Sequence, residues 1–162
     1  MANTQNLDTL IKPPKDIPPQ HQDRQPGIEK EMHPRPIYDT DEPGCGKLKD
    51  KVAIITGGDS GIGRAVAISF AKEGAEVVIV YLDEHEDAQE AAKSMKKYGK
   101  EPLLIAKDIS VENNCKDIVE QTLEKFGRID IVVNNAAIQF EKKSIEDISA
   151  EQLEKTFRTN IF

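Results

Sequence analysis

The chain has 162 residues, of which 38% are hydrophobic and 31% charged, and its formal net charge is −7. Such a composition is typical of a soluble globular domain. The apolar runs are far shorter than the ~20 residues of a membrane span, the amino terminus lacks the features of a secretory signal, and no basic cluster is present to bind a phosphate backbone. We therefore expect a cytoplasmic protein that binds neither membrane nor nucleic acid.

The two cysteines, Cys45 and Cys115, lie in no metal-ligand or C-x-x-C spacing. We expect Cys45 to be an exposed loop thiol and Cys115 to be a core residue of a helix, with no chemistry for either. No metal site is expected.

Residues 1–47 are rich in proline, since eight of the nine prolines lie between Pro13 and Pro43. No apolar period of 2 or 3.6 residues runs through this stretch, which predicts an extended arm without a core of its own. Two interpretations are open: a disordered tail, or a strap along a neighbouring subunit. The candidate anchors of a strap are Ile28, Met32, Ile37 and Tyr38.

Four short runs follow the arm and are mainly apolar: residues 52–56, 77–81, 103–106 and 129–133. Runs of this kind are typical of strands buried on both faces of a parallel sheet. We expect a strand at each of them.

Helical patterns separate and follow these runs. Apolar residues share one face over residues 62–70, 88–95 and 111–126. Each of these patterns ends at a glycine: Gly74, Gly99 and Gly127. Ser110 is the expected cap of the third helix, and Ser149 with Gln152 predicts a capping box for a fourth.

This alternation predicts an α/β fold, a Rossmann-like doubly wound parallel sheet of which the first four strands and helices are present and the remainder is missing. Two parts are expected: the Pro-rich extended arm at 1–47, and the amino-terminal half of a nucleotide-binding domain at 48–162. The fourth strand is expected to have an unpaired apolar edge.

The turn between the first strand and the first helix is rich in glycine, in the sequence TGGDSGIG at residues 56–63. In a doubly wound sheet this turn lies at the carboxyl ends of the strands, where nucleotides bind. Glycine lets a pyrophosphate approach the backbone, and the helix start supplies exposed amides and positive potential. The lysine of a phosphate-gripping NTPase loop is absent, which disfavours ATP hydrolysis.

The spacing Thr56-Gly57-x-x-x-Gly61-x-Gly63 resembles the cofactor loop of the short-chain dehydrogenase/reductase family in its single-domain form. Further matches follow in the family's order: Asp108 after the third strand, NNAA at 134–137, and Asn160 in FRTNIF. The segment GKLKDKVAIITGGDSGIGRAVA after a proline-rich arm is similar to the general-stress-protein-like bacterial oxidoreductases of this family.

The resemblance implies a nicotinamide dinucleotide cofactor. Gly57, Ser60 and Ile62 would meet the adenine ribose and the pyrophosphate, with Gly61 and Gly63 permitting close approach. A merely tight turn is the alternative for this loop.

Later positions would bind the rest of the cofactor. Asp108, followed by Ile109, would contact the adenine, although Asp108 could also be a turn cap with Ser110. The backbone of Asn135, Ala136 and Ala137 would pass the cofactor riboses, with Ala137 in place of the family's usual glycine. Asn134 is expected to brace the sheet.

The choice between NAD and NADP depends on the end of the second strand, where an acid suits an unmodified ribose and a base suits a 2′-phosphate. This position holds Tyr81, Leu82 and Asp83. Asp83 near the ribose favours NAD. Arg64 has two interpretations, a phosphate ligand or an exposed arginine at the helix start, of which we favour the exposed residue.

The family's chemistry requires a serine and a Tyr-x-x-x-Lys pair, and none of the three tyrosines begins that motif. The chain ends at Phe162 within a helical pattern, so we expect the front half of a longer enzyme. Asn160 matches the asparagine of the family's catalytic tetrad, which serves a proton relay, and the alternative is a satisfied core asparagine.

The intact protein is therefore expected to be an NAD(P)-dependent oxidoreductase that transfers a hydride between nicotinamide and an alcohol or carbonyl substrate. The resemblance also implies a homo-oligomer at full length. The 162-residue chain itself is expected to be inactive. The alternative is a non-catalytic dinucleotide-binding module, and epimerase or dehydratase chemistry is disfavoured by the glycine spacing.

Overall fold

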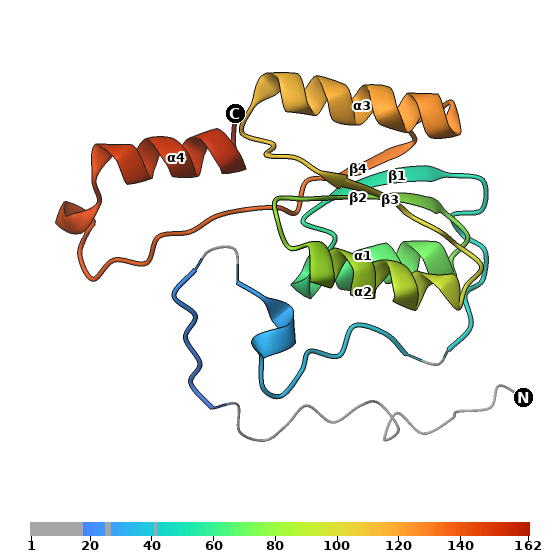
Figure 1. Cartoon of the computed structure of the whole chain (residues 1–162), viewed down its shortest axis with the longest axis horizontal. Helices are drawn as coiled ribbons and strands as arrows, with labels where there is room; N and C mark the ends of the chain where they lie inside the picture. The colour runs from blue at the N-terminus through green and yellow to red at the C-terminus, as the bar shows by residue number, and fades with distance from the viewer. Residues whose placement is uncertain (1–17, 25–26, 41) are drawn as a thin grey trace, which may run out of the picture.

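A computed structural model describes residues 18–24, 27–40 and 42–162 (Figure 1). Four parallel strands form one sheet in the order β3-β2-β1-β4. Their bounds are β1 Val52–Thr56, β2 Glu76–Tyr81, β3 Leu103–Ala106 and β4 Ile131–Val133. The predicted α/β fold and parallel Rossmann-like sheet are confirmed.

Helices cover both faces of the sheet. α1 (Gly61–Lys72) and α2 (His85–Lys96) lie on one face, and α3 (Glu112–Phe126) lies on the other (Figure 1). α4 (Ala150–Asn160) lies beyond the carboxyl ends of the strands, and none of its residues, all of which the structure describes, is buried. The described chain also has two 3-10 turns, η2 (Glu29–Glu31) and η3 (Ile145–Asp147).

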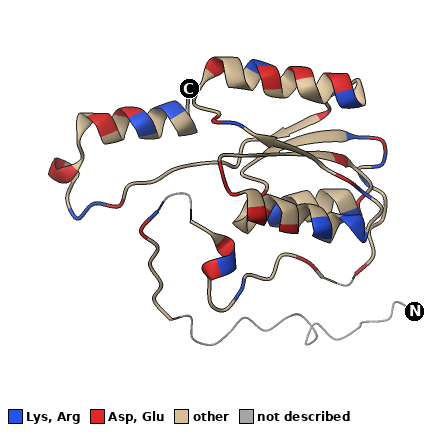
Figure 2. Cartoon of the chain, viewed as in Figure 1, with Lys and Arg blue, Asp and Glu red and all other residues tan. Residues whose placement is uncertain are grey.

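The core has two layers, one on each face of the sheet. Ile55 and Ile79 pack with α1 and α2, whereas Ile54 and Val78 pack with residues of α3. Neighbouring residues of one strand enter opposite layers because side chains alternate across a sheet. All five residues of β1 are buried, as expected for a strand covered on both faces. In Figure 2 the charged residues lie mainly on helices and loops, and the strands are nearly free of them.

The fourth strand lies at an edge of the described sheet. β4 pairs with β1, and Val132 at its centre is 55% exposed. The strand begins two residues later than expected. Just before it, Asp130 bonds to Val52 twice: its amide donates to the Val52 carbonyl oxygen, and its carboxylate accepts from Val52 N, both at 2.9 Å.

Helix ends follow most of the sequence signals. Gly127 ends α3 with a φ of 73°, and Ser149 and Gln152 form the predicted capping box. The prediction of Ser110 as the cap of α3 is wrong, because the cap position is Val111. The placement of Cys115 in a helix core is also wrong: Cys115 is exposed, and its Sγ–H donates to the Ile109 carbonyl oxygen at 3.2 Å.

The described part of the arm runs beside α1 and α2 of its own chain (Figure 1). Tyr38 packs against the α1 and α2 core layer, and Asp39 bonds to Lys72 and Lys97. Met32 and Ile37, two other candidate anchors, are exposed. Residues 1–17, 25–26 and 41 of the predicted arm lie outside the described residues, and a strap along a second subunit stays a prediction.

Candidate functional site

The loop between β1 and α1 turns through two glycines with positive φ. Gly57 has a φ of +63° and Gly61 a φ of +52°, a region that favours glycine. A Cβ at Gly63 would lie 1.9 Å from the Gly57 carbonyl oxygen, so the third glycine allows α1 to pack on the loop. Each glycine of the spacing therefore has its own structural reason.

A second loop, which follows β4, is tied to the glycine loop. Thr56 Oγ1 accepts hydrogen bonds from the backbone amides of Asn135 and Ala136, both at 3.0 Å. Asn135 Nδ2 donates to the carbonyl oxygens of Thr56 and Gly57. The prediction that Asn134 braces the sheet is wrong, because Asn134 is exposed and Asn135 makes these bonds. The alternation of side chains along the extended chain turns Asn135 inward.

A cavity of about 1020 Å³ opens where these loops meet, at the carboxyl ends of the strands. Its size is at the upper end of the ~300–1,000 Å³ typical of ligand pockets. Many of the predicted cofactor residues line it: Gly57, Ser60, Asp108, Ile109, Asn135, Ala136 and Ala137. The topology thus brings residues from three separate strand ends to one cavity.

Other predicted residues lie outside the described lining. Gly61 and Gly63 face the arm and the Gly57 carbonyl group, respectively, and the Ile62 side chain is 78% exposed. Asp83 is flanked by two lining residues, Leu82 and Glu84. None of these four residues is part of the described cavity wall.

Asp108 caps a turn in this structure. Its Oδ1 accepts a hydrogen bond from Ser110 N at 2.8 Å, while its side chain is exposed beside the cavity. This agrees with the turn-cap interpretation and leaves the other carboxylate oxygen for a ligand. The contact of Asp108 with adenine stays a prediction.

Three acidic residues lie near the end of β2, where the sequence predicts the cofactor ribose: Asp83 and Glu84 follow β2, and Asp59 belongs to the loop after β1. Burial raises the pKa of Asp59 and, together with a hydrogen bond to Asp83, raises the pKa of Glu84. The pKa of Asp83 is lowered by its hydrogen bonds with Glu84 and with Arg24. Arg24 Nη2 lies 2.7 Å from Asp83 Oδ1 and 3.0 Å from Glu84 Oε1. Asp83 and Glu84 therefore share one guanidinium from the arm.

Arg64 lies in a different place from the one expected. It is fully buried under the arm, 2.6 Å from Glu29 Oε1 and 3.3 Å from Asp87 Oδ1, and its guanidinium lies over the Tyr38 ring. The prediction of an exposed helix-start arginine is wrong because the arm supplies the carboxylate and the ring that cover it. Because its guanidinium is buried against these partners, Arg64 is not positioned to bind a phosphate group.

Asn160 holds the chain after β4. Its side chain accepts a hydrogen bond from Ile138 N and donates one to the Ile138 carbonyl oxygen, both at 2.9 Å. The residue is exposed rather than in a core. Thr159 beside it lines the cavity, so α4 ends next to the candidate site. A proton-relay role stays a prediction.

Sequence reasoning missed the contribution of the arm to the cavity. His21, Gln22, Asp23 and Arg24 are part of the wall. A signal was present, since residues 83–90 contain five acids and no lysine or arginine, and the arm offers Arg24, Lys30 and Arg35. All three bases pair with acids of that stretch.

Metal sites and membrane spans are absent from the part of the chain that the structure describes. No group of histidine, cysteine or carboxylate side chains there is arranged to hold a metal ion. No helix of the described chain has both the length and the apolar character needed to cross a bilayer.

Known proteins resemble this chain in sequence. The profile of the family described as short chain dehydrogenase matches residues 51–162. The uncharacterized oxidoreductase YhdF of Bacillus subtilis (strain 168) is 63% identical over 145 residues, 89% of this chain and 50% of that protein. General stress protein 39 of the same organism is 55% identical over 150 residues, 92% of this chain and 52% of that protein. The chain spans about half the length of the curated relatives it matches.

Solved structures resemble it as well. A short chain dehydrogenase from Burkholderia cenocepacia J2315 in complex with NADP matches with a TM-score of 0.67 and 34% identity. A 3-ketoacyl-(acyl-carrier-protein) reductase from Brucella melitensis complexed with NADH matches with a TM-score of 0.65 and 39% identity. Each match covers 71% of this chain and 46% of the other. Similar folds therefore bind either form of the nicotinamide cofactor.

Proposed function

The chain belongs to the short chain dehydrogenase family, and on that premise we propose that its cavity binds a nicotinamide dinucleotide for hydride transfer between the cofactor and an alcohol or carbonyl compound. The observation that carries the proposal is the bond between two loops: Asn135 ties the segment after β4 to Gly57 at the wall of one cavity. This arrangement gives a pyrophosphate access to bare backbone beside the amino terminus of α1.

The residues present fit such a cofactor. A Cβ at Gly57 would lie 2.9 Å from Asn135 Nδ2, so the glycine lets the loop after β4 pack against the loop after β1 at the cavity wall. Asp108 and Ile109 would hold the adenine, and Gly57 and Ser60 of the glycine loop would hold the pyrophosphate. The backbone of Asn135–Ala137 would lie along the riboses. When bound, the nicotinamide supplies the hydride chemistry.

The proposal includes NAD rather than NADP as the preferred cofactor. Asp83 and Glu84 follow β2, and Asp59 of the loop after β1 lines the same cavity as Glu84. An acid after β2 accepts hydrogen bonds from an unmodified ribose. Arg24 of the arm lies beside these acids, and two of the carboxylates pair with it. Calorimetric titration with NAD⁺ and NADP⁺ tests this choice. Tighter binding of NAD⁺ would support it, and tighter binding of NADP⁺ would overturn it.

We propose that catalytic turnover requires a protein that continues through a serine and a Tyr-x-x-x-Lys motif. Asn160 would take part in its proton relay. We propose that this protein is a cytoplasmic homo-oligomer. The 162-residue chain is proposed to bind cofactor without turnover. The test is to mix the protein expressed from its own gene with cofactor and each member of a panel of aldehydes, ketones and polyols. The absorbance of the reduced cofactor reports turnover. Cofactor binding without turnover on every member would favour the non-catalytic module.

A further inference from the structure

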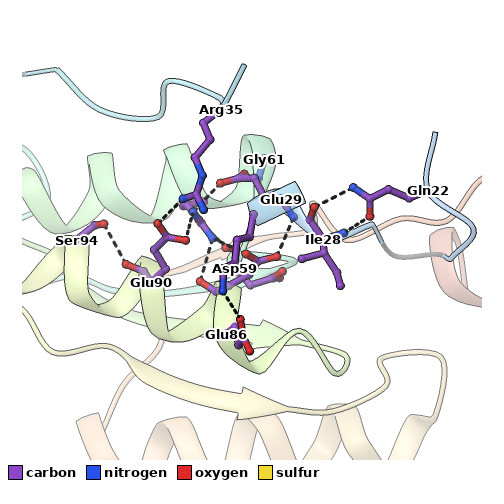
Figure 3. Close-up of polar contacts among 12 residues, drawn as sticks. Gln22, Ile28, Glu29, Arg35, Asp59, Gly61, Glu86, Glu90 and Ser94 are labelled. Carbon is purple, nitrogen blue, oxygen red and sulfur yellow. Dashed lines mark hydrogen bonds and ion pairs between the residues drawn. The ribbon is translucent and has the colours of Figure 1, made fainter. Parts of the chain in front are cut away.

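The arm reaches the outer side of the glycine loop through one buried carboxylate. Glu29, in η2, is 5% exposed. Its Oε2 accepts a hydrogen bond from Gly61 N at the start of α1, and its Oε1 lies 2.6 Å from Arg64 Nη1. Figure 3 shows Glu29 and Gly61 meeting between the arm and the helices.

Arg64 carries this contact to the loop. Its Nε donates to the Asp59 carbonyl oxygen at 2.7 Å, and its Nη2 donates to the Asp87 carbonyl oxygen at 3.0 Å. Within the described residues, Arg64 Nη1 forms an ion pair with Glu29 Oε1 but has no hydrogen bond of good geometry. Glu29 N also donates to Asp87 Oδ2 at 3.0 Å. The arm, the loop and α2 are therefore joined at one buried cluster, made of Glu29, Arg64 and Asp87.

The first amides of a helix need acceptors from outside the helix. Ser60 holds the cap position of α1, yet its side chain makes no capping hydrogen bond in the described structure. Glu29, which lies 32 residues earlier in the chain, supplies the acceptor for Gly61 instead. A carboxylate at this end of a helix is also favoured by the helix dipole.

The opposite side of the same short segment faces the cavity. Asp59 and Ser60 line the cavity wall, and the carbonyl of Asp59 and the amide of Gly61 are held from the outside by Arg64 and Glu29. We propose that Glu29 is a positioning residue for the cofactor: it fixes residues 59–61 in the conformation that the dinucleotide meets. This inference rests on the proposed function and makes the arm a part of the cofactor site.

The arm beside Glu29 also forms the cavity wall. Gln22 Nε2 donates to the Ile28 carbonyl oxygen at 2.9 Å, and Gln22 Oε1 accepts from Ile28 N at 2.7 Å (Figure 3). Gln22 and its neighbours His21 and Arg24 line the cavity. Anchoring Glu29 therefore anchors this wall through the adjacent residue Ile28.

The test compares Glu29→Ala, Glu29→Gln and the exposed control Glu31→Gln in the protein expressed from its own gene. Calorimetry gives the Kd of NAD⁺ at a temperature where circular dichroism shows each variant folded. Glu29→Ala should weaken binding by about tenfold, because a helix amide loses its acceptor and the buried Arg64 loses one of its carboxylate partners. Glu29→Gln keeps an acceptor for Gly61 N and should restore part of the loss, and Glu31→Gln should bind as the unaltered protein does.

A second readout separates positioning from overall stability. Hydrogen exchange of the Gly61 amide should be faster in Glu29→Ala than in Glu29→Gln, while amides of β1 and β2 keep their protection. Equal NAD⁺ affinity in Glu29→Ala and the unaltered protein would overturn the inference. Absence of dinucleotide binding in the unaltered protein would instead overturn the proposed function itself.

Discussion

Asn135 Nδ2 donates to the carbonyl oxygen of Gly57 across 3.1 Å, although the two residues stand 78 positions apart. The bond joins the ends of neighbouring strands β1 and β4 at the mouth of the cavity. Asn135 Nδ2 also donates a hydrogen bond to the Thr56 carbonyl oxygen at 3.0 Å. One side-chain amide therefore holds two backbone oxygens in place.

Replacing Asn135 by alanine should remove both bonds at once. Two partly buried carbonyl groups would lose their donor, which typically costs about 1–3 kcal/mol. We expect the free energy of unfolding to fall by that amount, and urea denaturation measures it. Asn134→Ala is the matched control, because Asn134 is exposed. Equal losses in the two variants would contradict the bracing role of Asn135.

Replacing Gly63 by alanine should displace α1 from the loop. The new Cβ would lie 1.9 Å from the Gly57 carbonyl oxygen, and overpacking of this kind costs about 1–3 kcal/mol. Dinucleotide binding should be lost together with stability. Gly99→Ala is the control for affinity: an alanine is strained at the φ of +72° found there, but its Cβ would meet no described atom within 4 Å, so stability should fall while NAD⁺ affinity stays unchanged. Unchanged NAD⁺ affinity in Gly63→Ala would count against this packing.

Replacing Arg64 by methionine should leave Glu29 and Asp87 buried without their cation. Breaking a buried ion pair on one side costs about 3–5 kcal/mol. The double variant Arg64→Met with Glu29→Gln should recover part of that loss, because one of the uncompensated charges is removed. Thermal denaturation of the single and double variants measures both effects. If the stability losses of the two single variants simply added up in the double variant, the two residues would not be coupled.

Acid should weaken the contact between the arm and the helices at Asp39. Partial burial opposes its ionisation, but hydrogen bonds from Lys97, Tyr98 and Lys72 outweigh burial and lower its pKa to about 2. A carboxyl with a lowered pKa stabilises the fold above its unfolded value, near 3.8, and that contribution is lost as the pH falls toward about 2. Stability measured between pH 5 and about 2 should therefore fall less in Asp39→Asn than in the unaltered protein.

A control variant separates this effect from general acid denaturation. A hydrogen bond from Arg128, together with one from the Val52 amide, lowers the pKa of Asp130 to about 2 as well. Asp130→Asn should therefore keep the part of the pH dependence that belongs to Asp39. If stability fell equally with pH in Asp39→Asn and in the unaltered protein, the pH dependence could not be assigned to Asp39.

The strands and the glycine loop could be predicted because their signals are local. The apolar run at Val52–Thr56 and the glycines around α1 each reflect a requirement of their own segment, burial on two faces or a positive φ. The capping box of Ser149 is local in the same sense. Such features need no knowledge of distant residues.

Two of the errors concern residues whose orientation or cover is set by contacts far along the chain. Arg64 is buried because Glu29 and Tyr38 reach it from the arm, and no periodicity within α1 indicates that cover. Asn135 rather than Asn134 faces β1, which depends on the phase of the chain after β4. Long-range charge complementarity between the arm and residues 83–90 was the available signal for the first of these.

A dinucleotide site in this cavity can be tested by titrating the isotope-labelled chain with NAD⁺ and following the amide chemical shifts. We expect saturable shifts at Gly57, Ser60, Asp108, Ile109 and Asn135–Ala137, which line the cavity, with smaller changes on the outer face of α3. Binding that left the glycine loop unperturbed, or the absence of any saturable shift, would contradict a dinucleotide site in this cavity.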